Sequence, residues 1–260
     1  MLSQDSLEKA VSGAGIEASP RYLDETPSTN TVALALAEEG APEWTVVAAG
    51  HQTAGRGRLG RTWASAPGRS LLFSVVLRPP LPPERAPLLS LLAAAEMVEA
   101  CPRPPEEPVR AKWPNDLLVG ERKVGGILPE ARVEGSGLKH LVLGVGMNVS
   151  MTEEDFPEEI LVTATSLGLE GASIEPGDLL ERFLVGFRGS YRPIDPDFGL
   201  HVVAGYQGVC ATVGRLVRAR TVAGDEVEGL AVAVDPDGSL VLEHEGERHS
   251  VAFGEVVHLD

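Results

Sequence analysis

Two apolar runs, WTVVAAG at 44–50 and SLLFSVVLR at 70–78, enclose a segment at 51–69 that is rich in glycine and arginine. Both runs are short, continuous and apolar, which predicts buried β-strands. The segment between them is too polar to be buried, so we interpret it as a long loop held at both ends by a sheet. The fold must therefore contain a sheet from which this loop projects.

The rest of the main part of the chain mixes helical and strand patterns. Helices are expected at 5–14, from a cap at Ser28 or Thr29 to Gly40, at 84–101 and at 177–190. Short strands are expected in VRAKW, DLLV, KVGGILPEARV and LKHLVLGVGMNV, between residues 109 and 149, because turn formers separate these runs.

The tail changes character at about residue 213. The runs GRLVRARTVAG, EVEGLAVAVD, GSLVLEHEG and ERHSVAF read as short alternating strands, with a turn at 236–238. Such a unit is marginal alone and is expected to pack on the main domain. We predict an α+β fold with a main domain at 1–212 and a small β-barrel at 213–260.

Composition excludes several classes of protein. The 260-residue chain carries a net charge of −16, which argues against general nucleic-acid binding. Cys101 and Cys210 lie far apart and outside any Cys-x-x-Cys motif, so neither a disulfide framework nor a structural metal site is expected. The sequence has no signal peptide and no apolar run long enough to span a membrane. We predict a cytoplasmic protein.

Charge is distributed unevenly along this acidic chain. No Asp or Glu occurs between Glu43 and Glu84. The same stretch carries Arg56, Arg58, Arg61, Arg69 and Arg78. Its text, GRGRLGRTW at 55–63, interleaves these arginines with Gly55, Gly57 and Gly60.

This loop is suited to an anionic ligand. Glycines let backbone N–H groups approach oxygens closely, and arginines bind the same oxygens in a bidentate way. Trp63 adds a flat surface for a base. The segment is not a Walker A loop, since the Gly-Lys-Ser/Thr ending is missing. A flexible linker is the alternative, and the flanking strands argue against it.

A second block, KWPNDLLVGERKVGGIL at 112–128, gathers groups that suit phosphate chemistry. Asp116 could hold Mg²⁺ through oxygen, Asn115 could bind a polar edge of the ligand, and Lys123 could neutralise charge on a phosphate. A third run, GVGMNV at 144–149, leaves room on one strand face and ends near Asn148. Taken alone, Asn-Asp is an ordinary turn and the third run an ordinary strand end.

Covalent catalysis has no visible machinery. The sequence has no Gly-x-Ser-x-Gly elbow, and no histidine can be paired with a carboxylate. His140 follows Lys139 near a strand start and is expected at the surface. The pattern favours a site that acts by electrostatic positioning.

The three blocks, in this order, closely resemble those of the biotin–protein ligases, the biotin–[acetyl-CoA-carboxylase] ligases. Ser28-Thr29-Asn30 and Gln52 match further family signatures, and the tail resembles the family's SH3-like C-terminal domain. The resemblance implies a mixed-sheet catalytic domain of the biotin/lipoate ligase type. It also implies a two-step reaction that uses ATP and Mg²⁺ to activate biotin and then modifies a lysine of a biotin carboxyl carrier protein.

The resemblance further implies site residues. Lys123, Arg58 and Asp116 would be catalytic, with Asp116 toward Mg²⁺. The biotin-binding set would be Ser28, Thr29, Asn30, Gln52, Gly55, Arg56, Gly57, Arg58, Lys123, Gly126, Leu128 and Gly144. The nucleotide-binding set would be Arg58, Arg61, Trp63, Asn115, Asp116, Lys123 and Asn148.

The chain departs from the family pattern in three places. Leu59 stands where some members have a third basic residue of the loop, and the chain ends His258-Leu259-Asp260 where some members have an arginine that reaches the nucleotide. Only 27 residues precede Ser28, too few for the DNA-binding domain of the repressor members, so no DNA binding is expected. The family includes monomers and dimers, so a homodimer is one expected form.

Three alternatives stay open. A lipoate–protein ligase has a related fold and reaction. A biotin- or nucleotide-responsive binding protein would bind ligand without turnover. Nucleic-acid binding through the arginine loop would be steeply salt-dependent.

Overall fold

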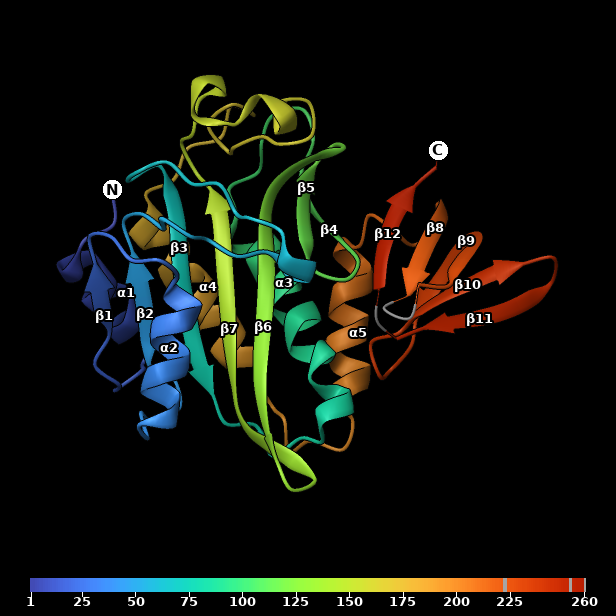
Figure 1. Cartoon of the computed structure of the whole chain (residues 1–260), viewed down its shortest axis with the longest axis horizontal. Coiled ribbons are helices and arrows are strands. Elements are labelled where there is room, and N and C mark those ends of the chain that lie inside the picture. Colours follow the sequence, from blue (N-terminus) through green and yellow to red (C-terminus); the bar gives the residue numbers. More distant parts are fainter. Residues whose placement is uncertain (222–223, 253, 260) are drawn as a thin grey trace.

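A seven-stranded mixed sheet forms the main part of the molecule in the computed structural model, which describes residues 1–221, 224–252 and 254–259 (Figure 1). The strand order is β1-β2-β3-β7-β6-β5-β4. The strands are β1 (Arg21–Leu23), β2 (Val46–Ala49), β3 (Ser70–Leu77), β4 (Val109–Lys112), β5 (Asp116–Val119), β6 (Arg122–Glu134) and β7 (Gly137–Asn148). Only β1 and β2 pair in parallel among these described strands.

Helices cover both faces of this sheet, so its central strands are apolar on both sides. Val47, Val76 and Val142 pack against α2 (Thr29–Glu38) on one face. Neighbouring residues such as Phe73 and Leu143 point to the opposite face and join the main core with α3 (Pro87–Ala100) and α4 (Pro176–Ser190). Figure 1 shows α2 in front of the sheet and α3 and α4 behind it. The continuous apolar runs seen in the sequence follow from this double burial.

The predicted helices are present with small shifts of their ends. α1 spans Gln4–Gly13 and begins at a Ser3 capping box. Ser28 is the N-cap of α2, and Gly40 after its end has a φ of 92°. The helix expected at 84–101 begins at Pro87, because proline is favoured in the first turn, where its missing N–H costs no hydrogen bond.

Helix α5 (Phe198–Val209) was not predicted. It contains Gly199, Gly205 and Gly208, which have low helix propensity and weaken the sequence signal. Its buried residues pack against α3, so tertiary contacts compensate for the propensity. Four short 3₁₀ turns complete the main domain: η1 (Arg58–Gly60), η2 (Pro83–Arg85), η3 (Glu153–Asp155) and η4 (Glu158–Ile160).

The tail forms a separate antiparallel sheet of five strands, ordered β11-β10-β9-β8-β12. Its strands are β8 (Leu216–Thr221), β9 (Glu226–Val234), β10 (Leu240–His244), β11 (Glu247–Val251) and β12 (Gly254–His258). The expected fold class, α+β with a small β-unit at the C-terminal end, is confirmed. Residues 222–223 and 253 of the expected strands, and Asp260 of the expected chain end, lie outside the described residues.

Trp113 fastens the tail to the main sheet. Its indole Nε1 donates to the carbonyl of Gly238 at 3.0 Å, and its backbone N–H donates to Thr212 Oγ1 at 3.1 Å. The side chain is buried between α3 and the turn that leads to β10. Within the described residues, no helix is both long and apolar enough to cross a membrane.

Candidate functional site

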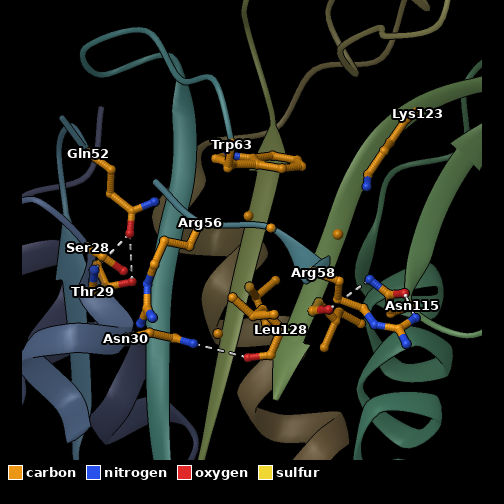
Figure 2. Close-up of a pocket in the computed structure, with 16 residues that line it drawn as sticks. Ser28, Thr29, Asn30, Gln52, Arg56, Arg58, Trp63, Asn115, Lys123 and Leu128 are labelled. Atoms are coloured by element: carbon orange, nitrogen blue, oxygen red, sulfur yellow. Dashed lines mark hydrogen bonds between the residues drawn. The ribbon is translucent and has the colours of Figure 1, made fainter. Parts of the chain in front are cut away.

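A pocket opens over β6 and β7, between the start of α2 and the loop that joins β2 to β3 (Figure 2). It brings together residues from five separate parts of the sequence. The lining residues are Ser28, Thr29, Asn30, Gln52, Arg56, Gly57, Arg58, Trp63, Asn115, Lys123, Gly126, Ile127, Leu128, Gly144, Val145 and Gly146.

Glycines make the floor of the pocket possible. A Cβ at Gly146 would lie 2.7 Å from the Trp63 indole, and one at Gly126 would lie 3.4 Å from the same ring. A Cβ at Gly144 would overlap the side-chain oxygen of Asn30. The two strands therefore carry glycine where other side chains must approach the backbone.

A polar wall, composed of Ser28, Thr29, Asn30 and Gln52, closes one side of the pocket (Figure 2). The first turn of α2 leaves its N–H groups without intrahelical partners, and the backbone N–H of Thr29 donates to Gln52 Oε1 at 2.7 Å. Asn30 Nδ2 donates to the Leu128 carbonyl at 3.1 Å and to Glu130 at 2.7 Å. The start of α2, the loop after β2 and strand β6 thus fix the wall in place.

The arginine loop, residues 54–62, forms a tight hairpin above the pocket. Arg56 pairs with Thr62 in an isolated bridge, and Gly57 N–H donates to the Arg61 carbonyl at 2.7 Å. Leu59, at the tip, has a φ of 54° and is 61% exposed. The exposed leucine at this position leaves the tip without a cation.

Each arginine of the loop contacts a different element. Arg56 forms an ion pair with Glu130 at 2.7 Å. Arg58 donates to Asn115 Oδ1 at 2.8 Å. Arg61 forms an ion pair of 2.6 Å with Glu255 of β12. Burial lowers the pKa of the Arg58 guanidinium, and the nearby Asp116 and Glu255 carboxylates oppose that effect.

Trp63 lies across the glycine floor. Lys123 Nζ is 5.7 Å from its ring centroid, a cation–π distance. Its indole Nε1 is buried without a hydrogen-bond partner in the described part of the chain. A flat apolar surface beside a cation, with one unused donor, suits an aromatic ligand that carries acceptors.

Lys123 and Asp116 form a charged pair opposite the polar wall. Lys123 Nζ lies 2.6 Å from Asp116 Oδ1, with the two side chains 37% and 28% exposed. Asn115 Nδ2 donates to the Ile127 carbonyl at 3.0 Å, which holds the amide over the strand. Burial lowers the pKa of the neighbouring Lys112, against the attraction of Asp116. This side of the pocket is positively charged and suits phosphate oxygens.

The structure brings thirteen of the sequence-predicted residues to the pocket wall and places four outside it. Gly55 packs beneath the carbonyl of Trp63 and the Gln52 amide, and Arg61 turns toward β12. Asp116 pairs with Lys123 but does not itself line the pocket. Asn148 is buried at the end of β7, where its Nδ2 donates to the Thr165 carbonyl at 2.9 Å.

Sequence reasoning missed several residues of the site. Ile127, Val145 and Gly146 line the floor, and their place in the predicted strands was the available signal. Glu130 joins the loop to the polar wall, and Ser74 lies behind that wall. No sequence signal pairs Glu130 with Arg56, because the two are 74 positions apart.

The expectation that His140 lies at the surface is wrong. Its side chain is fully buried on β7, and neither ring nitrogen has a hydrogen-bond partner among the described residues. Nε2 lies 3.7 Å from Glu38 of α2. Helix α2 covers this face of β7. The charged neighbour Lys139 suggested an exposed position, and nothing in the sequence indicated the covering helix.

The described residues contain no group of three or more His, Cys, Asp or Glu side chains arranged to hold a metal ion. Both cysteines are free. A cation at this site would therefore depend on Asp116 and on oxygens supplied by a ligand.

Two family models match the sequence. Residues 22–148 match the Biotin/lipoate A/B protein ligase family, and residues 212–259 match the biotin protein ligase C terminal domain. The biotin–[acetyl-CoA-carboxylase] ligase of Mycobacterium tuberculosis is 35% identical over 271 residues, which cover 99% of this chain and 96% of the relative. The bifunctional ligase/repressor BirA of Bacillus subtilis is 35% identical over 223 residues, 85% of this chain and 68% of the relative.

Solved structures are similar over most of the chain. The biotin protein ligase of Aquifex aeolicus in complex with biotin and ATP superposes with a TM-score of 0.69 at 26% identity, covering 92% of this chain and 97% of that one. Its R40G mutant in complex with biotin has a TM-score of 0.72 at the same identity and coverage.

Proposed function

The chain belongs to the biotin protein ligase family, and on that premise we propose that it activates biotin with ATP and transfers the biotinyl group to a lysine of a biotin carboxyl carrier protein. One observation carries the proposal. A single pocket holds a polar wall, a glycine floor under Trp63, and a cationic side formed by Arg58 and Lys123. The polar wall suits a polar ring, the glycine floor under Trp63 suits a base, and the cationic side suits a phosphate.

The polar wall would hold the ureido ring of biotin. Ser28, Thr29 and Gln52 offer hydroxyl and amide groups that can bind its N–H and C=O groups. Leu128 and Gly144 would line the apolar part of the ligand, with Asn30 fixing the wall behind it. The biotin carboxylate would then point toward the loop residues Arg56, Gly57 and Arg58.

In the first step, a biotin carboxylate oxygen attacks the α-phosphorus of ATP. The new bond joins that oxygen to phosphorus, the bond to the bridging oxygen breaks, and pyrophosphate leaves with the electron pair. Lys123 and Arg58 would stabilise the charge that builds on the α-phosphate. Trp63 and Asn115 would position the nucleotide, and Arg61 and Asn148 would support it from outside the pocket. Gly55 would shape the loop that closes over the biotin carboxylate.

In the second step, the ε-amine of the carrier lysine attacks the carbonyl carbon of biotinyl-5′-AMP. An amide bond forms, the bond between that carbon and the phosphate oxygen breaks, AMP leaves and the amine loses a proton. The arginine loop would shield the mixed anhydride from water until the carrier arrives.

Mg²⁺ fits this site as a partner of ATP. Asp116 supplies one carboxylate, whose Oδ1 contacts Lys123 Nζ, and Mg²⁺ ordinarily takes one or two carboxylates together with substrate phosphates. Asp116 would hold the ion, which would neutralise phosphate charge when bound.

Several further features belong to the proposal. We propose the division into a catalytic domain at 1–212 and an SH3-like domain at 213–260, supported by the two separate sheets. A homodimer and a cytoplasmic location are proposed from the resemblance to the family. Absence of DNA binding is proposed from the net charge of −16 and from the pairing of Arg56 and Arg61 with carboxylates.

Pyrophosphate release tests the first step. The protein is incubated with ATP and Mg²⁺ plus biotin, plus lipoate, or with neither. Release with biotin alone is expected. Release with lipoate alone would assign the chain to the lipoate ligases of the same family. Release with neither would favour a binding protein without turnover.

A further inference from the structure

Ser74 is a buried hydroxyl directly behind the polar wall. It lies on β3, is fully buried and does not line the pocket. Its Oγ is 2.8 Å from Thr29 Oγ1 and 2.6 Å from Asn30 Oδ1. A polar group in such a place affects the ligand only through the residues it contacts.

The orientation of the Asn30 amide is fixed by its other contacts. Its Nδ2 faces the Leu128 carbonyl at 3.1 Å and the Glu130 carboxylate at 2.7 Å. A carbonyl and a carboxylate paired with arginine only accept hydrogen bonds, so the NH₂ group must face them. Asn30 Oδ1 therefore faces Ser74 and needs a donor.

This requirement fixes the hydroxyl hydrogens. Ser74 has a single hydrogen, which must go to Asn30 Oδ1. Thr29 must then donate to Ser74 Oγ, because two hydroxyl oxygens 2.8 Å apart repel each other unless a hydrogen lies between them. The Thr29 hydroxyl has one other acceptor within reach, Gln52 Oε1 at 3.1 Å, and that group also belongs to the polar wall.

This assignment of donors and acceptors also determines which hydrogen-bonding groups face the pocket. The Thr29 hydroxyl, its hydrogen used inside the wall, can offer a ligand only lone pairs. Gln52 Oε1 accepts from the backbone N–H of Thr29, so its Nε2 remains as a donor, with no hydrogen-bond partner within the described chain. The wall offers an acceptor beside a donor, the complement of a cyclic urea.

We infer that Ser74 is a positioning residue that determines specificity for the ureido N–H of biotin, by holding the Thr29 hydroxyl as an acceptor. The inference rests on the proposed function, because it names the group of biotin that the wall recognises. Ser74 itself does not touch the ligand.

Analogues of biotin that lack one donor test the inference. In each of two cyclic carbamates, one ureido N–H is replaced by oxygen. An oxygen opposite the lone pairs of Thr29 loses a hydrogen bond, so one of the two analogues should bind wild-type protein roughly 10- to 100-fold more weakly than biotin. Calorimetry gives the Kd of each ligand without requiring turnover.

Three variants separate the hydroxyl from the packing. In Ser74→Ala, Thr29 keeps only Gln52 Oε1, which is 3.1 Å away and already accepts the Thr29 backbone N–H, so the hydroxyl hydrogen can turn toward an acceptor on the ligand. Ser74→Cys preserves the side-chain volume but supplies a weak donor. In both variants the ratio of carbamate Kd to biotin Kd should fall below about fivefold, whereas Ser74→Thr, which retains the hydroxyl, should restore the wild-type ratio.

The ratio distinguishes this role from a structural one, because a loosened pocket weakens both ligands alike. A wild-type ratio near one, or a ratio that stays within about twofold of wild type in both Ser74→Ala and Ser74→Cys, would overturn the inference. Wild-type protein that binds biotin but releases no pyrophosphate would contradict the proposed function alone. Failure to bind biotin would overturn both.

Discussion

Lys123 carries the largest share of the proposed chemistry. Its ammonium lies between Asp116 and the Trp63 ring, at the cationic side of the pocket. Replacing Lys123 with Ala should lower the rate of pyrophosphate release roughly 10²- to 10³-fold, the cost of losing one group that stabilises a developing charge.

The matched control is Lys139→Ala on the neighbouring strand β7. Lys139 is 35% exposed, close to the 37% of Lys123, and it also pairs with a carboxylate, Glu38 at 3.0 Å. That variant should retain wild-type activity, and both should keep the wild-type circular dichroism spectrum. Near-normal release by Lys123→Ala would remove Lys123 from the catalytic role.

His140 should make stability depend on pH. Burial lowers its pKa below the ordinary 6.5, helped by Arg78, Lys139 and Arg132 and opposed by Glu38. The unfolded chain therefore binds the proton more readily than the folded one. The neutral histidine's contribution to the free energy of unfolding is complete above about pH 6.5 and is lost as the pH falls below that value toward the lower folded-state pKa.

Urea denaturation between pH 5 and pH 8 checks this sign. His140→Phe should lose less stability on acidification than wild type, because phenylalanine fills the site without titrating. Part of the dependence should remain, since burial also lowers the pKa of His258. His201→Gln, which changes a histidine with a 68% exposed side chain, is the control. Equal acid sensitivity of wild type and His140→Phe would contradict the account.

Single residues differ in how well the sequence predicted them. Ser28, Lys123 and the loop arginines were found because they belong to compact blocks of sequence. Ser74 is one hydroxyl in an apolar strand, and nothing in its neighbourhood shows that it faces α2. His140 was misplaced because strands covered on both faces have no polar side, so alternation carries no information.

At the scale of elements, glycines on β6 and β7 create the pocket floor. Replacing Gly146 with Ala would place a Cβ 2.7 Å from the Trp63 indole, so the ring must move. Overpacking of this kind costs about 1–3 kcal/mol, which predicts a KM for ATP raised roughly tenfold.

Gly137→Ala, on the same strand, is the matched control. A Cβ there meets no atom within 4 Å, so its KM for ATP should equal that of wild type. Steady-state kinetics at saturating biotin measures both variants. An unchanged KM in Gly146→Ala would show that Trp63 does not face the nucleotide.

Elements were predicted well where burial and local signals agree. The strands at 46–49 and 70–77 were found from apolar runs alone, and α2 from its cap and its terminal glycine. Helix α5 was missed because its three glycines give it a low helix propensity. Contacts with α3 stabilise it, and those contacts cannot be seen in the sequence. The start of α3 shifted to Pro87, since proline favours the first turn over the helix interior.

At the scale of the whole molecule, Trp113 connects the main sheet to the tail. Its indole donates to the carbonyl of Gly238, which phenylalanine cannot do. Trp113→Phe should therefore lower the free energy of unfolding by about 1–3 kcal/mol, because it leaves a buried carbonyl without a donor.

The control is Trp44→Phe, which changes a half-buried tryptophan that contacts Phe187 and Tyr191 edge-on. The Trp44 indole makes no hydrogen bond within the described residues, so Trp44→Phe should lower the free energy of unfolding by less than Trp113→Phe does. Urea denaturation followed by circular dichroism measures both variants. Equal costs would contradict a role for the Trp113 hydrogen bond in joining the two sheets.

Contacts between the two sheets were beyond the reach of the sequence. Arg61 meets Glu255, and Arg215 meets Glu121, across separations that no local pattern encodes. The sequence did predict that the tail forms its own β-unit, because its alternation and turn residues are local. What it could not predict is which charges the assembled domains bring together.

Biotinylation of a carrier tests the central claim most directly. A biotin carboxyl carrier domain is incubated with the protein, biotin, ATP and Mg²⁺, and its intact mass is measured beside a copy whose acceptor lysine is replaced by arginine. We predict that the carrier gains the mass of one biotinyl group, only when both biotin and ATP are present and only on the acceptor lysine. A carrier of unchanged mass, with folded enzyme that binds biotin, would contradict the account.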